Sequence, residues 1–306
     1  MILSASRRTD IPALYPRWIV NRLRAGEILV VNPYNRKKVT RLRFTPESVD
    51  CIVFWTKNPE PLIPYLREID EMGYRYCFQM TVTDYGRDIE PEIPRTEDAI
   101  ATFLLLSEMI GKERIDWRFD PLLLTERYSV EYHRERFAQM CEWMHNATER
   151  CVTSFVDFYR GCPYPEPEDE EICRLAEGMA KEAGKYGLPI YTCSEKIDLS
   201  PYGIMHGACI DKDRLRRVAG YKLDLKKDTG QRPHCMCAES IDVGAYDTCV
   251  NGCGYCYAVG RTGNARRNYE NHDPESPLLV GTLKGDETVT EKILHSSIDY
   301  QLSLFD

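Results

Sequence analysis

The sequence lacks long apolar runs. None of its 306 residues lies in a stretch of the roughly 18 consecutive apolar residues that a membrane-spanning helix requires. The N-terminus leads within a few positions to Arg7 and Arg8, without the apolar core of a signal peptide. We therefore expect a cytoplasmic protein that has no membrane partner.

Several enzyme motifs are missing as well. The chain contains no phosphate-binding P-loop, no H-E-x-x-H zinc motif and no nucleophile elbow. No internal repeat or low-complexity tract interrupts it. The sequence therefore gives no support to a hydrolase that uses one of these devices.

Cysteine, by contrast, is plentiful. The chain has 13 cysteines, an odd number, in a sequence without a secretion signal. This favours reduced thiols and metal ligands over a disulfide framework. Cys51 and Cys77 lie within apolar stretches and are expected to be small buried hydrophobic residues.

Three of the cysteines form a compact C-x3-C-x2-C array of Cys249, Cys253 and Cys256. Three thiolates on so short a loop converge on one soft metal centre, and a four-iron four-sulfur cluster held by three cysteines leaves one iron free to bind a ligand. The two glycines of the array suit a tight loop, because glycine adopts positive φ at little cost. The alternative is a structural zinc site with a fourth ligand such as Cys237.

This spacing, with Tyr255 just before the last cysteine, resembles the signature of the radical S-adenosylmethionine (radical SAM) superfamily. The resemblance implies that Cys249, Cys253 and Cys256 hold a 4Fe-4S cluster whose free iron chelates S-adenosylmethionine. It also implies an electron donor such as flavodoxin or ferredoxin, which would trigger release of a deoxyadenosyl radical.

Predicted strands and helices alternate along most of the chain. We expect strands at 2–6, 28–32, 50–55, 75–82, 115–119, 151–158 and 188–193. Helices are expected over 16–25, 62–72, 96–110, 130–145 and 169–186, with Thr96 capping the third. Strands separated by helices of this length predict βαβ units and an α/β fold with a parallel β/α barrel or partial barrel.

The predicted organisation has three parts. Residues 1–199 would form the barrel, residues 200–270 a cysteine-rich metal-binding segment that completes it, and residues 271–306 a C-terminal tail. Radical SAM barrels ordinarily begin with the strand that feeds the cysteine loop, whereas here the cysteines come last. If residues 241–246 form that strand, the barrel is a circular permutation whose next strand in space is 2–6.

Polar residues follow the predicted strands, where parallel α/β folds place their chemistry. They are Ser4, Ser6, Arg7, Arg8, Thr9, Asp10, Thr56, Lys57, Asn58, Gln79, Thr81, Thr83, Arg118, Asp120, Ser154, Asp157 and Tyr159. Taken singly, each is equally consistent with a cap or a solvated loop residue. As a group they predict a site, with Lys57, Gln79, Arg118 and Asp157 on its substrate side.

The first loop of the chain carries a second resemblance. In the permuted barrel, Ser6, Arg7, Thr9 and Asp10 occupy the place where radical SAM enzymes bind the amino group of S-adenosylmethionine, although the usual Gly-Gly-Glu is missing. Thr9-Asp10 and Thr56-Lys57-Asn58-Pro59 resemble motifs of the spore photoproduct lyase branch. The predicted cofactor-binding residues are these four together with Tyr255.

Nearly the whole chain also resembles a mainly bacterial family without an established activity. Its marks are Ser-Arg-Arg-Thr-Asp-Ile-Pro near the start and Tyr-Asp-Thr-Cys…Gly-Cys-Gly-Tyr-Cys-Tyr-Ala near the end. This resemblance implies the cluster and the fold but no substrate.

A second set of cysteines, Cys193, Cys209, Cys235 and Cys237, precedes the array. Four thiolates would complete either an auxiliary iron–sulfur cluster or a zinc site and would attach residues 200–240 to the barrel. The single residue between the last two is unusual for zinc. The alternative is a group of buried thiols beside the active site.

Two features bear on partners. The net charge is −8, yet up to Arg43 ten basic residues stand against two acidic ones, a local charge of +8 that suits phosphates or an anionic cofactor, or simply a solvated surface. Residues Gln301–Phe305 match the peptide by which bacterial DNA-processing enzymes dock on the replication sliding clamp, although such a segment could also pack on its own domain.

Together these features favour a radical SAM enzyme that acts on damaged or modified DNA. The main rival is a non-catalytic module, stabilised by zinc or an iron–sulfur cluster, that binds DNA or the clamp. A two-cluster electron-transfer protein is the third interpretation, although it leaves the barrel without a purpose.

Overall fold

The structure, a computed structural model, describes residues 1–157, 159 and 162–300. Its centre is an eight-stranded sheet in the order β10-β1-β4-β5-β6-β7-β8-β9, in which every neighbouring pair is parallel. The strands are β10 (Ile241–Asp242), β1 (Ile2–Ala5), β4 (Cys51–Thr56), β5 (Tyr76–Thr81), β6 (Ile115–Leu122), β7 (Cys151–Phe155), β8 (Ile190–Cys193) and β9 (Met205–Gly207). The predicted parallel α/β fold is therefore confirmed.

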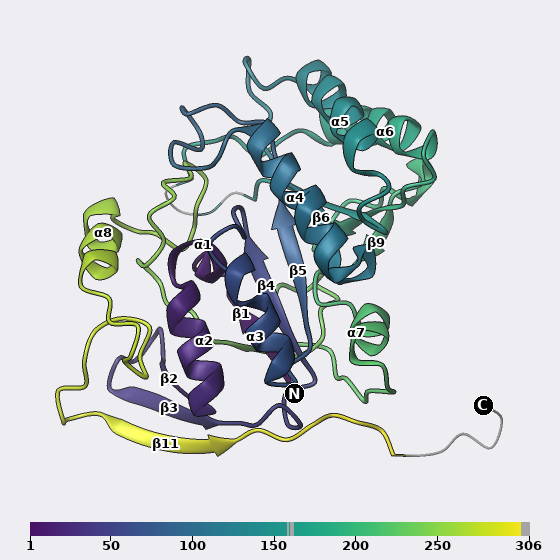
Figure 1. The fold of residues 1–306 in the computed structure, drawn as a ribbon. Coiled ribbons are helices and arrows are strands. Elements are labelled where there is room, and N and C mark those ends of the chain that lie inside the picture. The colour runs from purple at the N-terminus through teal and green to yellow at the C-terminus, as the bar shows by residue number, and fades with distance from the viewer. Residues whose placement is uncertain (158, 160–161, 301–306) are drawn as a thin grey trace.

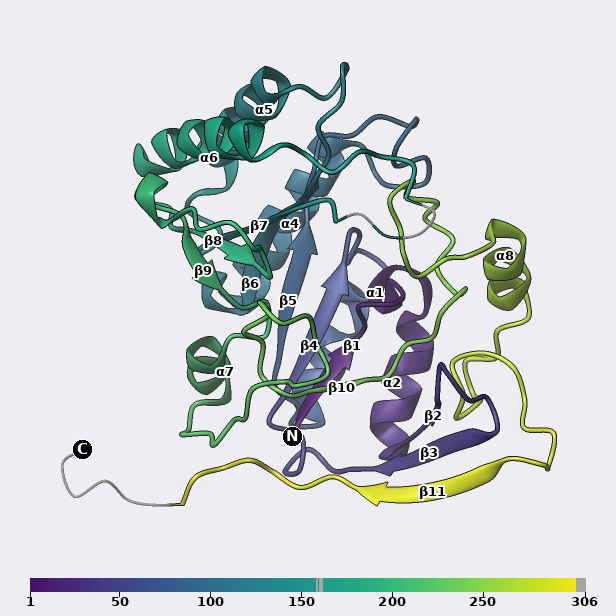
Figure 2. The ribbon, with the colours of Figure 1, turned by 180° about the vertical axis from the view of Figure 1, so that it is seen from behind.

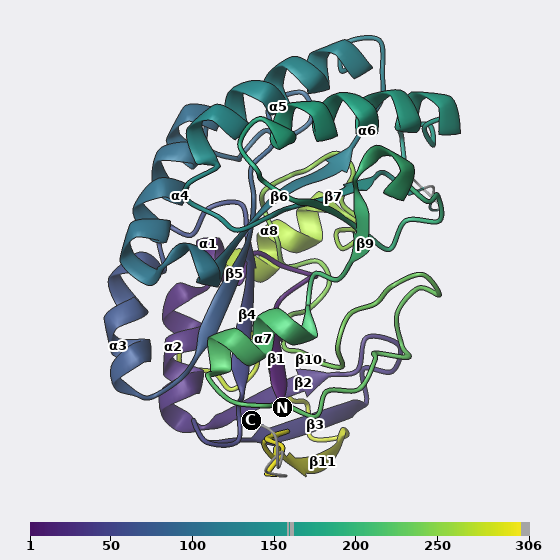
Figure 3. The same cartoon turned by 90° about the vertical axis from the view of Figure 1, so that its right-hand side faces the viewer.

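Helices cover the outer face of the sheet. Figure 3 shows α2 to α6 in an arc around the curved sheet, with α7 on the opposite, inner side. The helices are α1 (Ile11–Leu14), α2 (Pro16–Ala25), α3 (Leu66–Glu71), α4 (Thr96–Ile110), α5 (Val130–Met144), α6 (Asp169–Gly184), α7 (Lys212–Ala219) and α8 (Thr262–Glu270), with short 3-10 turns η1 (Ile63–Tyr65), η2 (Lys112–Arg114) and η3 (Ser200–Tyr202). This layering gives the sheet two apolar cores, one on each face.

The sheet curves but does not close. In the described part of the chain β9 and β10 are the two edges, and no hydrogen-bonded ladder joins them. The connection between them, which includes α7, runs over the inner face, and Ile210, Leu215 and Leu223 belong to the core there (Figure 2). The architecture is a partial parallel barrel with its open side crossed by this connection.

A second, three-stranded sheet lies below α2 (Figure 1). It has the order β11-β3-β2, with β11 (Thr288–Ile293) parallel and β2 (Glu27–Val31) antiparallel to β3 (Lys38–Arg43). The strand predicted at 28–32 thus belongs to a different sheet from the other predicted strands. The segment predicted as a C-terminal tail contributes β11.

Local sequence explains several boundaries. Helix α2 ends as predicted at Gly26, which has a φ of 61° and whose added Cβ would lie 2.6 Å from the Phe44 carbonyl oxygen. The prediction that Thr96 caps α4 is wrong. Arg95 is the N-cap residue, and the Thr96 hydroxyl donates instead to the Asp84 carboxylate, because that loop packs against the first turn of the helix.

The late strand β10 lies beside the first strand of the chain. Leu3 pairs with Ile241 and Ser4 with Asp242, both in parallel register. The residues just after β1 and just after β10 therefore lie at the same edge of the sheet. Within the described residues, no helix has the length and apolar character to cross a membrane.

Candidate functional site

The loop that carries Cys249, Cys253 and Cys256 crosses the carboxyl ends of the strands next to β10. Asn251 Nδ2 donates to Asp10 Oδ2 at 3.4 Å, in the loop after β1. Gly254 N donates to the Ile89 carbonyl oxygen at 2.8 Å, in the loop after β5. The three cysteines thus lie over the edge of the sheet at which polar residues were expected to gather.

The glycines of this loop allow close packing. Gly252 has a φ of 72°, and a Cβ there would lie 2.8 Å from Pro91 Cγ. A Cβ on Gly254 would lie 2.5 Å from the Tyr164 hydroxyl oxygen. Only glycine satisfies both positions without displacement of a neighbour.

The three thiols share one half-buried environment. Burial raises the pKa of Cys249 to about 12 and also raises the pKa values of Cys253 and Cys256, so a bound metal would have to displace their protons. Backbone N–H groups point at two of the sulfurs, from Asn251 and the Asp10 backbone at Cys249 and from residues 258 and 259 at Cys256. Such donors stabilise bound thiolates.

Asp242, at the end of β10, organises the loop after β1. Its carboxylate accepts hydrogen bonds from the Arg7 N–H (2.8 Å), the Gly244 N–H (3.0 Å) and the Ser6 hydroxyl, and it forms an ion pair with Arg8 (3.2 Å). The hydroxyl of Ser6, a predicted cofactor residue, is therefore already used to shape the loop.

Asp10 links three loops. Its carboxylate caps α1 at the Ala13 N–H (3.1 Å) and accepts from the Lys57 N–H (2.8 Å) and from Asn251. Burial raises its pKa to about 6, even though these donors favour the charged form. Its position next to the cysteine loop agrees with the prediction, but its contacts are those of a residue that positions others.

Two polar groups on the same loop have no partner. The Arg7 Nη2 and Thr9 Oγ1 atoms are buried and make no hydrogen bond to any described residue. The Arg7 guanidinium lies 5.1 Å from the centre of the Trp55 ring, and Arg118 lies 5.2 Å from the same ring. Unpaired buried donors beside a cysteine loop fit a polar ligand that the chain itself does not supply.

Lys57 faces the cysteine loop. Its Nζ lies 2.9 Å from Glu90 Oε1 and 5.8 Å from the centre of the Tyr255 ring, and the Tyr255 hydroxyl donates to Glu90. Burial acts to lower the pKa of Lys57, but the carboxylate of Glu90, with contributions from Cys253 and Asp120, outweighs it, and the pKa is raised. Lys57 thus places a lasting positive charge beside Cys253.

Gln79 and Arg118 lie deeper, on the inner face of the sheet. Arg118 Nη1 donates to Gln79 Oε1 at 3.2 Å, and the guanidinium forms a two-point ion pair with Asp120. The Gln79 amide donates in turn to Asp116, which holds Arg150 at 2.8 Å. The predicted substrate-side residues Gln79 and Arg118 therefore belong to one buried polar network.

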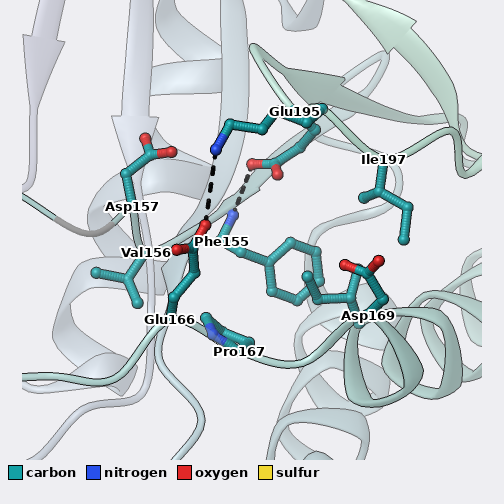
Figure 4. A pocket seen from close by; sticks show the side chains of 10 residues that line it. Phe155, Val156, Asp157, Glu166, Pro167, Asp169, Glu195 and Ile197 are labelled. Atoms are coloured by element: carbon teal, nitrogen blue, oxygen red, sulfur yellow. Dashed lines mark hydrogen bonds and ion pairs between the residues drawn. The ribbon is translucent and has the colours of Figure 1, made fainter.

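Asp157 stands apart from them. It forms an ion pair with Arg232 and is about half exposed, with 49% of its side-chain surface accessible. Figure 4 shows it at the rim of a pocket beyond β7 and β8, in which Glu195 accepts a hydrogen bond from Phe155 N at 2.9 Å and Glu166 lies near Lys196. The prediction that Asp157 joins Lys57, Gln79 and Arg118 has no contact to support it.

The second set of cysteines comes together on the inner face. The sulfur atoms of Cys193, Cys209 and Cys237 all lie within 4.8 Å of one another, and all three residues are buried. The Cys235 thiol hydrogen-bonds with that of Cys237. Among the described residues this trio is the one group of three or more metal-binding side chains with so close a spacing, so the thiols of the C-x3-C-x2-C array lie farther apart.

Sequence inspection missed four residues of this region. Asp242, Glu90, Trp55 and Asp116 each contact predicted site residues. A carboxylate within the predicted strand 241–246 and another within 115–119 were available signals, because such positions are ordinarily apolar. Glu90 lies in a long loop, where no periodicity singles it out.

The comparisons with known proteins identify a family but no activity. The profile of a family described as "Domain of unknown function (DUF1848)" matches residues 2–258. No curated protein matches the chain. A solved Bacteroides thetaiotaomicron protein, named as a candidate alpha-L-fucosidase, is 11% identical over 72% of this chain and 83% of its own, with a TM-score of 0.28. A likeness this low carries no argument about fold or activity.

Proposed function

The chain belongs to the family described as Domain of unknown function (DUF1848), and we propose that it is a radical SAM enzyme with a circularly permuted partial barrel. One observation carries the proposal. The C-x3-C-x2-C loop lies over the carboxyl ends of β1 and β5, in a parallel sheet where the loop after β1 presents two unpaired buried donors. This is the edge of a parallel sheet at which ligands bind.

The cysteine loop fits a 4Fe-4S cluster better than a single ion. Cys249, Cys253 and Cys256 have wider mutual spacing than the trio on the inner face, and a cluster separates its thiolates more than one tetrahedral ion does. When bound, the cluster and S-adenosylmethionine would supply radical chemistry. The three thiolates would hold it, with the Lys57 charge and backbone N–H groups offsetting their negative charge.

The loop after β1 fits the polar end of the cofactor. Arg7 Nη2 would donate to the carboxylate, whereas Thr9 Oγ1 could donate to the carboxylate or accept from the ammonium group. Asp242 and Asp10 would keep that loop in place against the cysteine loop. The Trp55 ring, which lies against the guanidinium groups of Arg7 and Arg118, would cover the inner side of the site and exclude water.

DNA as the substrate stays a prediction from the sequence. The clamp-like peptide Gln301–Phe305 lies outside the described residues. Of the ten basic residues up to Arg43, six form ion pairs: Arg8, Arg17, Arg24, Lys37, Arg41 and Arg43. The folded surface is thus less basic there than the sequence alone indicates.

The test is cofactor cleavage. The protein is purified and reconstituted without oxygen, and deoxyadenosine is measured after addition of S-adenosylmethionine and dithionite. We expect deoxyadenosine from the wild type and from Cys173→Ala, a half-exposed cysteine on α6, and none from Cys253→Ala.

Zinc at the C-x3-C-x2-C loop and no cofactor cleavage would refute the proposal and favour the non-catalytic module. In that case fluorescence anisotropy with DNA oligonucleotides, measured at two salt concentrations, decides whether the module binds DNA, because phosphate contacts weaken steeply with salt.

A further inference from the structure

The buried cysteines on the inner face form a separate centre. Cys193 ends β8, Cys209 follows β9 by two residues, and Cys235 and Cys237 lie in the loop that leads to β10. All four are at most 8% exposed. We propose that together they bind one Zn²⁺ ion through their four thiolates, independently of the radical SAM proposal.

The spacing of the sulfurs indicates a single ion. Zinc binds thiolates at about 2.3 Å in a tetrahedron, which sets neighbouring sulfurs about 3.8 Å apart. The sulfurs of Cys193, Cys209 and Cys237 lie within 4.8 Å of one another without any ion, so small rotations of the side chains bring them to that separation. A four-iron cube would force them farther apart, because its iron and sulfide atoms lie between the ligands.

Cys235 is the natural fourth ligand. Its thiol is a hydrogen-bond neighbour of that of Cys237, and rotation of its side chain would bring it to the trio of Cys193, Cys209 and Cys237. The residue between them, Met236, is 53% exposed, whereas Cys235 and Cys237 are 5% and 2% exposed. Cys235 and Cys237 therefore face the interior while Met236 between them faces solvent. This explains how a C-x-C pair, unusual for zinc in sequence, supplies two ligands here.

The surroundings balance the charge of the site. Four thiolates and one Zn²⁺ carry a net charge of −2. Arg118 Nη1 lies 2.6 Å from Cys209 Sγ, and the Ile210 N–H donates to Cys237 Sγ at 3.4 Å. The Arg7 guanidinium lies near the same sulfurs, so its positive charge also offsets theirs. Hydrogen bonds and cations around the ligands are the usual outer shell of a thiolate metal site.

The ion would fasten the open side of the barrel. Its ligands come from the β8–β9 edge of the sheet and from the connection that crosses the inner face to β10 at the other edge. In this position the site holds Arg118 through Cys209, next to Gln79 and Asp120. The zinc therefore orders the polar network around Arg118 on the inner face of the sheet.

The test measures zinc and iron per chain after anaerobic purification and reconstitution. We expect about one zinc in the wild type, less than about one-fifth of that in Cys209→Ser and Cys237→Ser, and an unchanged value in Cys141→Ser, a buried cysteine on α5 outside the group. Cys253→Ala should keep its zinc even if it loses iron, so this result is independent of the radical SAM proposal.

X-ray absorption at the zinc edge of the wild type gives a result even where a variant fails to fold. Four sulfur ligands at about 2.3 Å support the site, whereas three sulfurs and one lighter ligand would exclude Cys235 as the fourth. A wild type without zinc, zinc retained in both serine variants, zinc bound mainly by nitrogen or oxygen, or iron lost specifically in Cys237→Ser would each overturn it.

Discussion

Asp116→Asn should destabilise the protein strongly, because Asp116 neutralises two buried cations. Its side chain is fully buried, with Arg150 at 2.8 Å and Arg214 at 2.9 Å, and the charges of both arginines lower its pKa against the effect of burial. Arg214 is 2% exposed, and its guanidinium nitrogens have no hydrogen-bond partner among the described residues. Removing one partner of such a buried pair costs about 3–5 kcal/mol.

The assay is urea unfolding followed by circular dichroism at pH 7. The matched control is Glu71→Gln, which removes the exposed i,i+4 ion pair with Arg67 and should change the free energy of unfolding by less than about 0.5 kcal/mol. Adding Arg214→Met to Asp116→Asn removes a buried cation that keeps only Glu149, at 3.7 Å, as a partner, and should recover part of the loss. A loss below about 1 kcal/mol for Asp116→Asn would refute the reasoning, because the two arginines would then not depend on this carboxylate.

Three further changes test other parts of the structure. Gly252→Ala, at positive φ against a proline side chain, should lower the free energy of unfolding by about 2 kcal/mol in urea titrations, whereas Gly263→Ala, in open space on α8, should not lower it. Burial lowers the pKa of His133 to about 4, whereas the unfolded chain binds a proton at this residue near pH 6.5. The free energy of unfolding should therefore fall by about 2 kcal/mol between pH 7 and pH 5. Urea titrations at both pH values measure it, and the fall should be smaller in His133→Gln. Glu90→Gln removes the carboxylate beside Lys57 Nζ, and the pKa of Lys57, followed by NMR titration of ¹³C-methylated lysines, should fall; an unchanged value would mean that burial and Cys253 alone set it.

The main sheet could be predicted because its strands are buried on both faces. Cys51–Thr56 is a nearly continuous apolar run with a buried backbone, and glycines mark the ends of α2 and α4. The alternation of such runs with helices is enough to predict parallel strands. The predicted ends of these strands and helices therefore lie within a few residues of the observed ends.

Pairings between distant segments could not be predicted. β11 is exposed along its whole length and binds to β3 through backbone hydrogen bonds and the exposed ion pairs of Glu291, so its sequence carries no apolar pattern. The ion pairs that neutralise the basic start of the chain have the same origin, since Glu275 and Glu291 come from more than 240 residues away. In the site, the sequence predicted that Cys193, Cys209 and Cys237 would gather, as their sulfurs do, but only the fold separates Asp157 from Arg118.

In the shortest strand of the sheet, β10, side-chain hydrogen bonds take the place of backbone hydrogen bonds. β10 has only two residues, too few for its backbone pairing with β1 to fix the loop that follows. Asp242 compensates, because its carboxylate binds backbone and side-chain donors from Ser4 to Arg8 and the N–H of Gly244. A partly buried acceptor with that many donors favours one arrangement of the two loops. Asp242 thus fixes the start of the loop after β1, and Asp10 of that loop accepts a hydrogen bond from Asn251 of the cysteine array.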